Sequence, residues 1–150
     1  MASYFIPYYD THKCDCTRPY DGIPGMLKTI TAAGVRLAVA SNKYQDGAEK
    51  LVHHFFGEYD FVRILGQREG QPIKPDPAIV DQVLAEVPSV TKSETVYVGD
   101  SNVDMQTGLN AGVRTVGVSW GFRTREELAA YSPSAIVDTP EELSRVILGA

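Results

Sequence analysis

Five polar residues in this 150-residue chain have the types and positions needed to bind a phosphate group beside a divalent metal. They are Ser41, Asn42, Lys74, Asp100 and Asp104. Hydroxyl and ammonium groups donate hydrogen bonds to phosphate oxygens, and carboxylates are ligands that suit Mg²⁺. The set therefore predicts a phosphate site with an adjacent magnesium ion.

The two carboxylates follow an apolar run. Residues 96–98 lead through Gly99 into Asp100, and Asp104 comes four residues later. On a helix that spacing is about one turn, which places both carboxylates on one face. Mg²⁺ binds one or two protein carboxylates together with water and substrate phosphate, so we predict Asp100 and Asp104 as metal ligands. The alternative is a turn in which an aspartate only caps the helix.

Ser41 and Asn42 follow a second apolar run, residues 35–40, and precede a predicted helix. A hydroxyl at this position can donate to a phosphate oxygen, and the helix N-terminal amides add partial positive charge. We therefore predict that both residues bind phosphate. An ordinary helix N-cap is the alternative for the serine.

Lys74 is followed by Pro75, which disfavours a helical conformation at the lysine. An ammonium group presented by a rigid Pro-Asp-Pro turn suits phosphate binding and the neutralisation of charge during phosphoryl transfer. Lys74 is thus predicted to bind phosphate, and a solvated surface lysine is the alternative.

Strand-like and helix-like patterns alternate from residue 23 onward. Strands are predicted at 35–40, 61–65, 95–98, 115–119 and 135–137. Helices are predicted at 24–33, 44–56, 76–87 and 104–111, with two more beginning at the Thr-x-x-Glu sequences 124–127 and 139–142. This alternation predicts a doubly wound, mostly parallel α/β sheet, in which ligands bind beyond the carboxyl ends of the strands. Ser41, Lys74 and Asp100 would meet at that edge.

Residues 1–20 differ from residues 21–150, which form the predicted core. Aromatic side chains at positions 4, 5, 8 and 9 fit one face of a short helix, although Pro7 opposes it. We therefore predict an N-terminal helix followed by a linker. The helix either packs on the core or is the remnant of a second domain.

The composition disfavours several classes of protein. A net charge of −5 and a pI near 5.1 argue against binding to nucleic acid or to an anionic membrane surface. The sequence has no signal-peptide pattern and no apolar run near the ~18 residues of a membrane span. Cys14 and Cys16 are interpreted as loop thiols of a reducing compartment, because a zinc site needs four ligands. We expect a cytoplasmic protein that binds neither nucleic acid nor membrane.

The segments 38–43, 74–77 and 97–104 resemble the second, third and fourth motifs of the haloacid dehalogenase (HAD) superfamily, in order and in spacing. Over roughly residues 20–148 the chain is most similar to phosphoglycolate phosphatase-like members. The resemblance implies a HAD-like Rossmannoid core that hydrolyses the phosphomonoester of a small metabolite with Mg²⁺. Ser41 and Lys74 would be the catalytic residues that hold the transferring phosphoryl group. Asp100 would bind Mg²⁺, and Asp104 would bind it too or support its ligands.

The first motif of that superfamily, Asp-x-Asp-Gly-Thr after an N-terminal strand, has no match in the 150 residues. Asp10-Thr11 follows no strand-like pattern. The resemblance then implies that the nucleophilic aspartate, the acid–base aspartate and the central first strand are missing, and that residues 1–20 are a remnant of the helical cap and its linker. We expect the isolated chain to be inactive. It would be a truncated gene product, the product of a misassigned start or an engineered fragment.

A missing central strand would leave buried backbone groups unpaired on both neighbouring strands. Either those neighbours close on each other, or another segment fills the gap, or a second copy does so in a homodimer. A catalytically dead module that binds phosphate or a partner is the alternative function. A phospho-receiver domain uses similar residues, but there the phosphorylated aspartate precedes the lysine, whereas here Lys74 precedes Asp100.

Overall fold

A computed structural model describes residues 3–7, 22–57, 59–119 and 124–149. Its six described strands are β1 (Ser3–Pro7), β2 (Arg36–Tyr44), β3 (Phe61–Gln67), β4 (Thr95–Gly99), β5 (Arg114–Val118) and β6 (Ala135–Val137). The described helices are α1 (Ile23–Ala32), α2 (Gln45–Phe56), α3 (Ala78–Glu86), α4 (Asn102–Ala111), α5 (Arg125–Ala129) and α6 (Pro140–Gly149), with a 3₁₀ turn, η2 (Lys92–Glu94), before β4.

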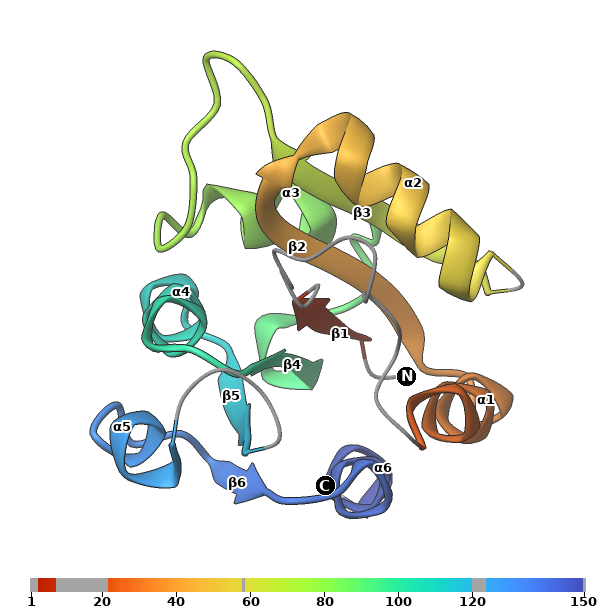
Figure 1. Ribbon diagram of the computed structural model, residues 1–150, viewed down its shortest axis with the longest axis vertical. Helices are drawn as coiled ribbons and strands as arrows, with labels where there is room; N and C mark the ends of the chain where they lie inside the picture. Colours follow the sequence, from red (N-terminus) through yellow and green to blue (C-terminus); the bar gives the residue numbers. More distant parts are fainter. Residues whose placement is uncertain (1–2, 8–21, 58, 120–123, 150) are drawn as a thin grey trace.

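The strands form one parallel sheet in the order β3-β2-β1-β4-β5-β6. Figure 1 shows α1, α2 and α6 on one face of this sheet and α3, α4 and α5 on the other. All five residues of β4 are buried, as expected for a parallel strand that helices cover on both faces. The predicted doubly wound, mostly parallel α/β fold is therefore confirmed.

The side chains of β4 alternate between two apolar clusters. Val96 and Val98 pack in the cluster that holds Leu27 of α1 and Leu143 of α6. Tyr97 points to the opposite face, into the cluster that includes residues of α3 and α4. The sheet is thus held between two helical layers, and the carboxyl ends of its strands remain as the edge at which a ligand can bind.

The N-terminal segment corrects one prediction and decides between the alternatives left open for the central strand. Ser3–Pro7 is a strand, not part of a helix, and it pairs in parallel with β2 on one side and β4 on the other. The central position of the sheet is therefore occupied by the chain's own β1, which is the alternative in which another segment fills the gap. Aromatic and β-branched residues favour strands, Pro7 disfavours a helix, and pairing satisfies backbone groups of both neighbours. The rest of the predicted cap remnant, residues 1–2 and 8–20, lies outside the described residues.

The predicted boundaries need smaller corrections elsewhere. β2 continues to Tyr44, so Ser41 and Asn42 lie within the strand and not after it, and its register with β3 is irregular between Ala40 and Tyr44. Both predicted Thr-x-x-Glu caps are confirmed. Thr124 Oγ1 accepts a hydrogen bond from the Glu127 amide at 3.2 Å, and the matching bond between Glu142 and Thr139 is 3.1 Å. In the described part of the chain no helix is long and apolar enough to cross a bilayer.

Gly108 allows α4 to lie close against the sheet. A Cβ at this position would overlap Thr115 Cγ2 and would lie 3.3 Å from Tyr97 Cβ. We expect Gly108→Ala to lower the free energy of unfolding by about 1–3 kcal/mol, although alanine is the better helix former. Gly25→Ala in α1 is the matched control, because a Cβ there meets nothing within 4 Å, and it should raise stability by about 0.5–1 kcal/mol. Urea denaturation measures both, and equal effects would contradict the close packing of α4.

Candidate functional site

A buried ion pair connects two of the predicted site residues. Lys74 Nζ lies 2.7 Å from Asp104 Oδ1, and the two side chains are only 8% and 3% exposed. The same ammonium donates to the carbonyl oxygen of Ala40, in β2, at 3.4 Å. Lys74, which comes from the loop before α3, therefore links the middle of β2 to the first turn of α4.

The second oxygen of Asp104 organises the turn between β4 and α4. Asp104 Oδ2 accepts hydrogen bonds from the Asp100 amide and from Ser101 Oγ, both at 3.1 Å. Ser101 Oγ in turn accepts from the Asp104 amide at 3.2 Å, as the N-cap of α4. Both carboxylate oxygens of Asp104 thus take part in contacts within the protein, so its geometry is that of a residue that supports Lys74 and Asp100.

Gly99 is what lets Asp104 fold back over the end of β4. A Cβ on Gly99 would overlap Asp104 Cβ and lie 2.6 Å from its Cγ. No side chain larger than hydrogen fits between this strand end and the carboxylate. A glycine at the last position of β4 is therefore needed for Asp104 to reach Lys74.

Ser41 and Asp100 flank the central strand. Ser41, in β2, is 2% exposed, and Asp100, which directly follows β4, is 9% exposed. Since β1 pairs with both β2 and β4, these two side chains come from strands on either side of it. Four of the five predicted residues thus gather at one edge of the sheet. The fifth, Asn42, lies in β2, and its side chain is outside what the structure describes.

Comparison with known proteins identifies the family of this chain. The model of the haloacid dehalogenase-like hydrolase family matches residues 1–118. The chain belongs to this family. Among its HAD relatives, a phosphoglycolate phosphatase from Psychrobacter arcticus is 33% identical over 135 residues, which cover 89% of this chain and 58% of the relative. An N-acetylmuramic acid 6-phosphate phosphatase from Pseudomonas aeruginosa is 30% identical over 145 residues, or 95% and 63% of the two chains.

Solved structures of HAD proteins have the same fold. A candidate phosphoglycolate phosphatase from Lactobacillus delbrueckii subsp. bulgaricus superposes with a TM-score of 0.80 at 37% identity, covering 88% of this chain and 54% of that one. CbbY from Rhodobacter sphaeroides, solved in complex with phosphate, superposes with a TM-score of 0.69 at 30% identity, covering 82% and 55%. The chain spans little more than half the length of these two HAD structures.

The carboxylates at this edge of the sheet can hold Mg²⁺ only if they suit its coordination. Among the described residues no group of three or more His, Cys, Asp or Glu side chains could hold a metal by itself. Mg²⁺ does not require such a group, because it retains several waters and binds through one or two carboxylates and a substrate phosphate. Asp100, buried beside Asp104 at the end of β4, fits that open kind of site.

Sequence reasoning did not identify Asn110, whose amide Nδ2 donates to the Pro75 carbonyl oxygen at 3.0 Å. Asn110 lies at an exposed position near the end of α4 and belongs to none of the motifs of the family. Asn110 meets the loop that contains Lys74 only in the folded chain, so no pattern in the sequence points to it.

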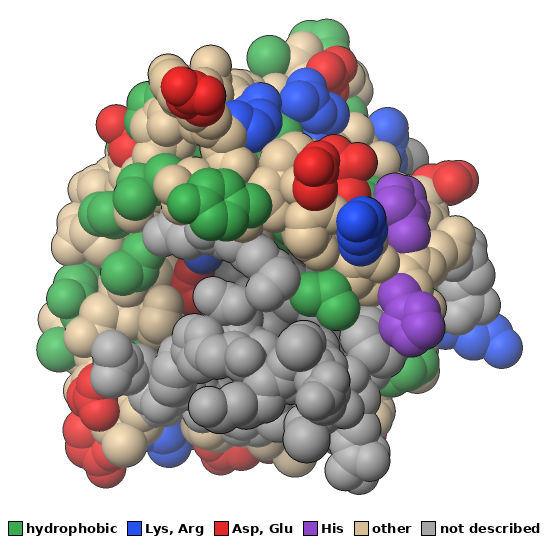
Figure 2. Space-filling model, turned by 45° about the horizontal axis from the view of Figure 1, so that its top comes forward, with side chains coloured by type: hydrophobic (Ala, Val, Ile, Leu, Met, Phe, Trp, Pro, Cys, Tyr) green, Lys and Arg blue, Asp and Glu red, His purple; other side chains and the backbone are tan. Residues whose placement is uncertain are grey.

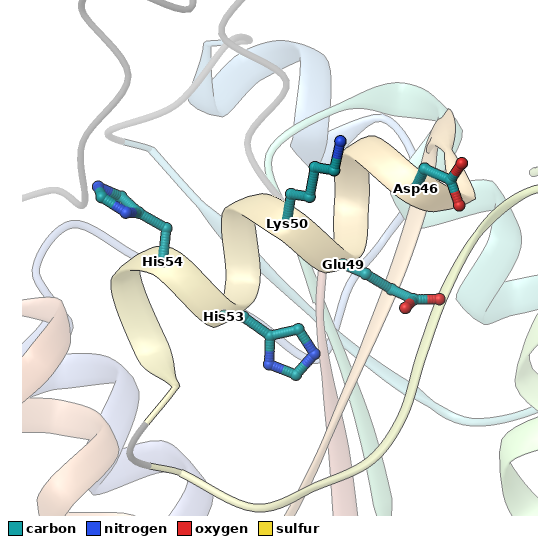
Figure 3. Close-up of a pocket in the computed structure, with 5 residues that line it drawn as sticks. All are labelled: Asp46, Glu49, Lys50, His53 and His54. Atoms are coloured by element: carbon teal, nitrogen blue, oxygen red, sulfur yellow. The ribbon is translucent and has the colours of Figure 1, made fainter.

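A pocket on the outer surface of α2 does not share residues with this site. It is lined by Asp46, Glu49, Lys50, His53 and His54, all on one helix. In the close-up of Figure 3, His53 and Glu49 project on one side of α2, whereas Lys50 and His54 project on the other. These side chains do not converge on a common point, so we assign the pocket no ligand.

Tyr97 should make the stability of the fold sensitive to alkaline pH. Burial raises the pKa of its hydroxyl well above the usual value of 10.0, and the nearby charge of Asp104 raises it further. Above pH 10 the unfolded chain loses this proton while the folded chain keeps it, so the free energy of unfolding falls by about 1.4 kcal/mol per pH unit. Tyr97→Phe should reduce that fall. Urea denaturation between pH 8 and 11 measures it, and an equally steep fall in Tyr97→Phe would contradict the assignment.

Proposed function

We propose that this chain is the core of a Mg²⁺-dependent phosphomonoester hydrolase of the phosphoglycolate phosphatase-like kind. The observation that carries the proposal is the buried Lys74 ammonium, which is held 2.7 Å from Asp104 at the edge where Ser41 and Asp100 also lie. A buried lysine in this family, fixed near a hydroxyl in β2 and a carboxylate that follows β4, is suited to bind a phosphoryl group.

Each residue has a distinct role in the proposed site. Lys74 and the Ser41 hydroxyl bind oxygens of the phosphoryl group, and Asn42 assists from β2. Asp100 holds Mg²⁺ together with water and a phosphate oxygen, and Asp104 keeps Lys74 and the Asp100 turn in place. When bound, the metal supplies positive charge that stabilises the phosphoryl oxygens as the bond to phosphorus breaks.

The proposed substrate class is a small phosphorylated metabolite. Two HAD relatives are named for phosphoglycolate and for N-acetylmuramic acid 6-phosphate, both of which are small phosphomonoesters. The net charge of −5 supports a site that attracts its anion locally. On the face shown in Figure 2, acidic and basic side chains of the described residues are interspersed, and no long basic stripe of the kind that nucleic-acid binders use is seen among them.

We further propose that the 150-residue chain alone does not turn over its substrate, because Asp-x-Asp-Gly-Thr is absent from it. The second candidate function is a phosphate-binding module without catalysis. It is supported by the presence of the proposed phosphate-binding residues and by the absence of Asp-x-Asp-Gly-Thr from the 150 residues.

Calorimetric titration with inorganic phosphate tests the site. We expect Mg²⁺ to tighten phosphate binding by about tenfold or more in the wild-type chain, and Asp100→Asn to abolish this gain while weaker metal-free binding remains. Asp60→Asn is the control. It removes the same charge from an exposed position before β3, at the opposite edge of the sheet, and should retain the gain.

Two results would count against the proposal. No phosphate binding by the wild-type chain would reject the site as a whole. A gain from Mg²⁺ that survives in Asp100→Asn would reject the assignment of Asp100.

A further inference from the structure

The turn that carries Lys74 is tied to α4 at two separate points. Lys74 Nζ contacts Asp104 Oδ1 at 2.7 Å, and Asn110 Nδ2 donates to the Pro75 carbonyl oxygen at 3.0 Å. Gln106, one helical turn before Asn110, donates from Nε2 to Asn110 Oδ1 at 2.9 Å. This second bond orients the Asn110 amide so that its NH₂ group faces the turn. One helix therefore contacts both the ammonium group of Lys74 and the backbone carbonyl of the next residue, Pro75.

The two contacts lie at opposite ends of α4. Asp104 belongs to its first turn and Asn110 to its last, and a rise of 1.5 Å per residue separates their Cα atoms by roughly 9 Å along the axis. With its ammonium held by Asp104 and the following residue, Pro75, held by Asn110, Lys74 has little freedom to move. Because long side chains lose rotamer freedom when they bind a ligand, fixing this one beforehand lowers the cost of binding an anion.

We propose that Asn110 is a positioning residue for Lys74. Its amide, oriented by Gln106, holds the Lys74–Pro75 turn against α4 so that the ammonium is already in place when a phosphate arrives. The effect on phosphate binding rests on the proposed function, whereas the anchoring of the turn does not.

The effect of Asn110→Ala on thermal stability separates a role in positioning Lys74 from a general role in stabilising the fold. Asn110 is exposed and alanine is a better helix former than asparagine, so Asn110→Ala should leave thermal stability close to that of the wild type. A change in the behaviour of the Lys74 ammonium in this variant would then come from the lost hydrogen bond and not from a less stable fold. Leu109→Ala is the matched control, because Leu109 is the preceding residue, is 44% exposed and takes no part in this chain of hydrogen bonds.

The experiment follows the Lys74 ammonium group by ¹⁵N NMR in the 150-residue chain and titrates inorganic phosphate in the presence of Mg²⁺. Loss of the signal in Lys74→Arg assigns it. In Asn110→Ala we expect faster exchange of the ammonium protons with water and a phosphate Kd raised by about threefold to tenfold. Gln106→Ala should give a smaller change in the same direction, and Leu109→Ala none.

Unchanged ammonium exchange in Asn110→Ala would overturn the proposal, as would equal changes in Leu109→Ala. Faster exchange with an unchanged phosphate Kd would also overturn it, because the turn would then be anchored without any effect on the anion. If the wild-type chain binds no phosphate, the proposed function fails. In that case, faster exchange of the ammonium protons in Asn110→Ala but not in Leu109→Ala would still support the anchoring of the turn. The two failures can therefore be told apart.

Discussion

Asp104→Asn is expected to lower the free energy of unfolding by about 3–5 kcal/mol, because it leaves the buried Lys74 ammonium without its carboxylate. Folded domains are typically stable by only about 5–15 kcal/mol, so this single change would remove a large share of the total. Phosphate binding should be lost as well, since the ammonium is no longer held at the strand ends. Urea denaturation at neutral pH measures the first effect and phosphate titration the second.

Glu86→Gln is the matched control for this change from acid to amide. Glu86 pairs with Arg63 at 3.0 Å, but the two side chains are 49% and 37% exposed. An exposed pair contributes about 0–1 kcal/mol, so Glu86→Gln should be nearly neutral. A loss below about 1 kcal/mol in Asp104→Asn as well would mean that the Lys74–Asp104 pair is in contact with water.

The double variant Lys74→Met, Asp104→Asn separates stability from binding. It removes both charges, so no unpaired ion is left in the interior, and its loss of stability should be smaller than the sum of the two single changes. Phosphate binding should remain absent in the double variant. Additive losses would show that the two side chains do not interact.

The sequence was sufficient for the fold wherever local pattern and tertiary packing agree. β4 is a continuous apolar run and is buried on both faces, and the caps of α5 and α6 lie where Thr-x-x-Glu predicts them. The N-terminus is the exception. The aromatic residues at positions 4, 5, 8 and 9 are compatible with one helical face, yet pairing with β2 and β4 makes Ser3–Pro7 a strand. Such long-range pairing is invisible to a local pattern.

In the candidate site, too, some features follow from the sequence pattern and others only from the folded structure. The types and spacing of Ser41, Lys74, Asp100 and Asp104 predict that they lie near one edge of the sheet, since parallel strands bring their carboxyl ends to one edge, but not that β2 continues past Ser41. The roles within the group depend on geometry that spacing does not encode. Only the close approach at Gly99 directs Asp104 toward Lys74 and the Asp100 amide.

The largest effect is expected in catalysis. With Mg²⁺ and p-nitrophenyl phosphate, the 150-residue chain should show no hydrolysis above that of Lys74→Met. A version extended at its N-terminus by a strand that ends in Asp-x-Asp-Gly-Thr should gain turnover of up to about 10⁶-fold, the size of effect that removing a nucleophile has in an unrelated hydrolase. A steady-state assay of the two proteins and of Lys74→Met in each measures this. An extended version that binds phosphate without hydrolysis would favour the non-catalytic alternative.

That gain requires a rearrangement of the sheet. By the family resemblance the nucleophile follows the central strand, but β1 already occupies the place between β2 and β4. The added strand would have to displace Ser3–Pro7, so the amides of this segment should lose hydrogen-exchange protection as activity appears. Asp10, three residues beyond β1 in the sequence and outside the described residues, provides the opposing test. If the unextended chain hydrolyses the ester and Asp10→Asn abolishes the reaction, the chain has its own nucleophile and the proposed inactivity is wrong.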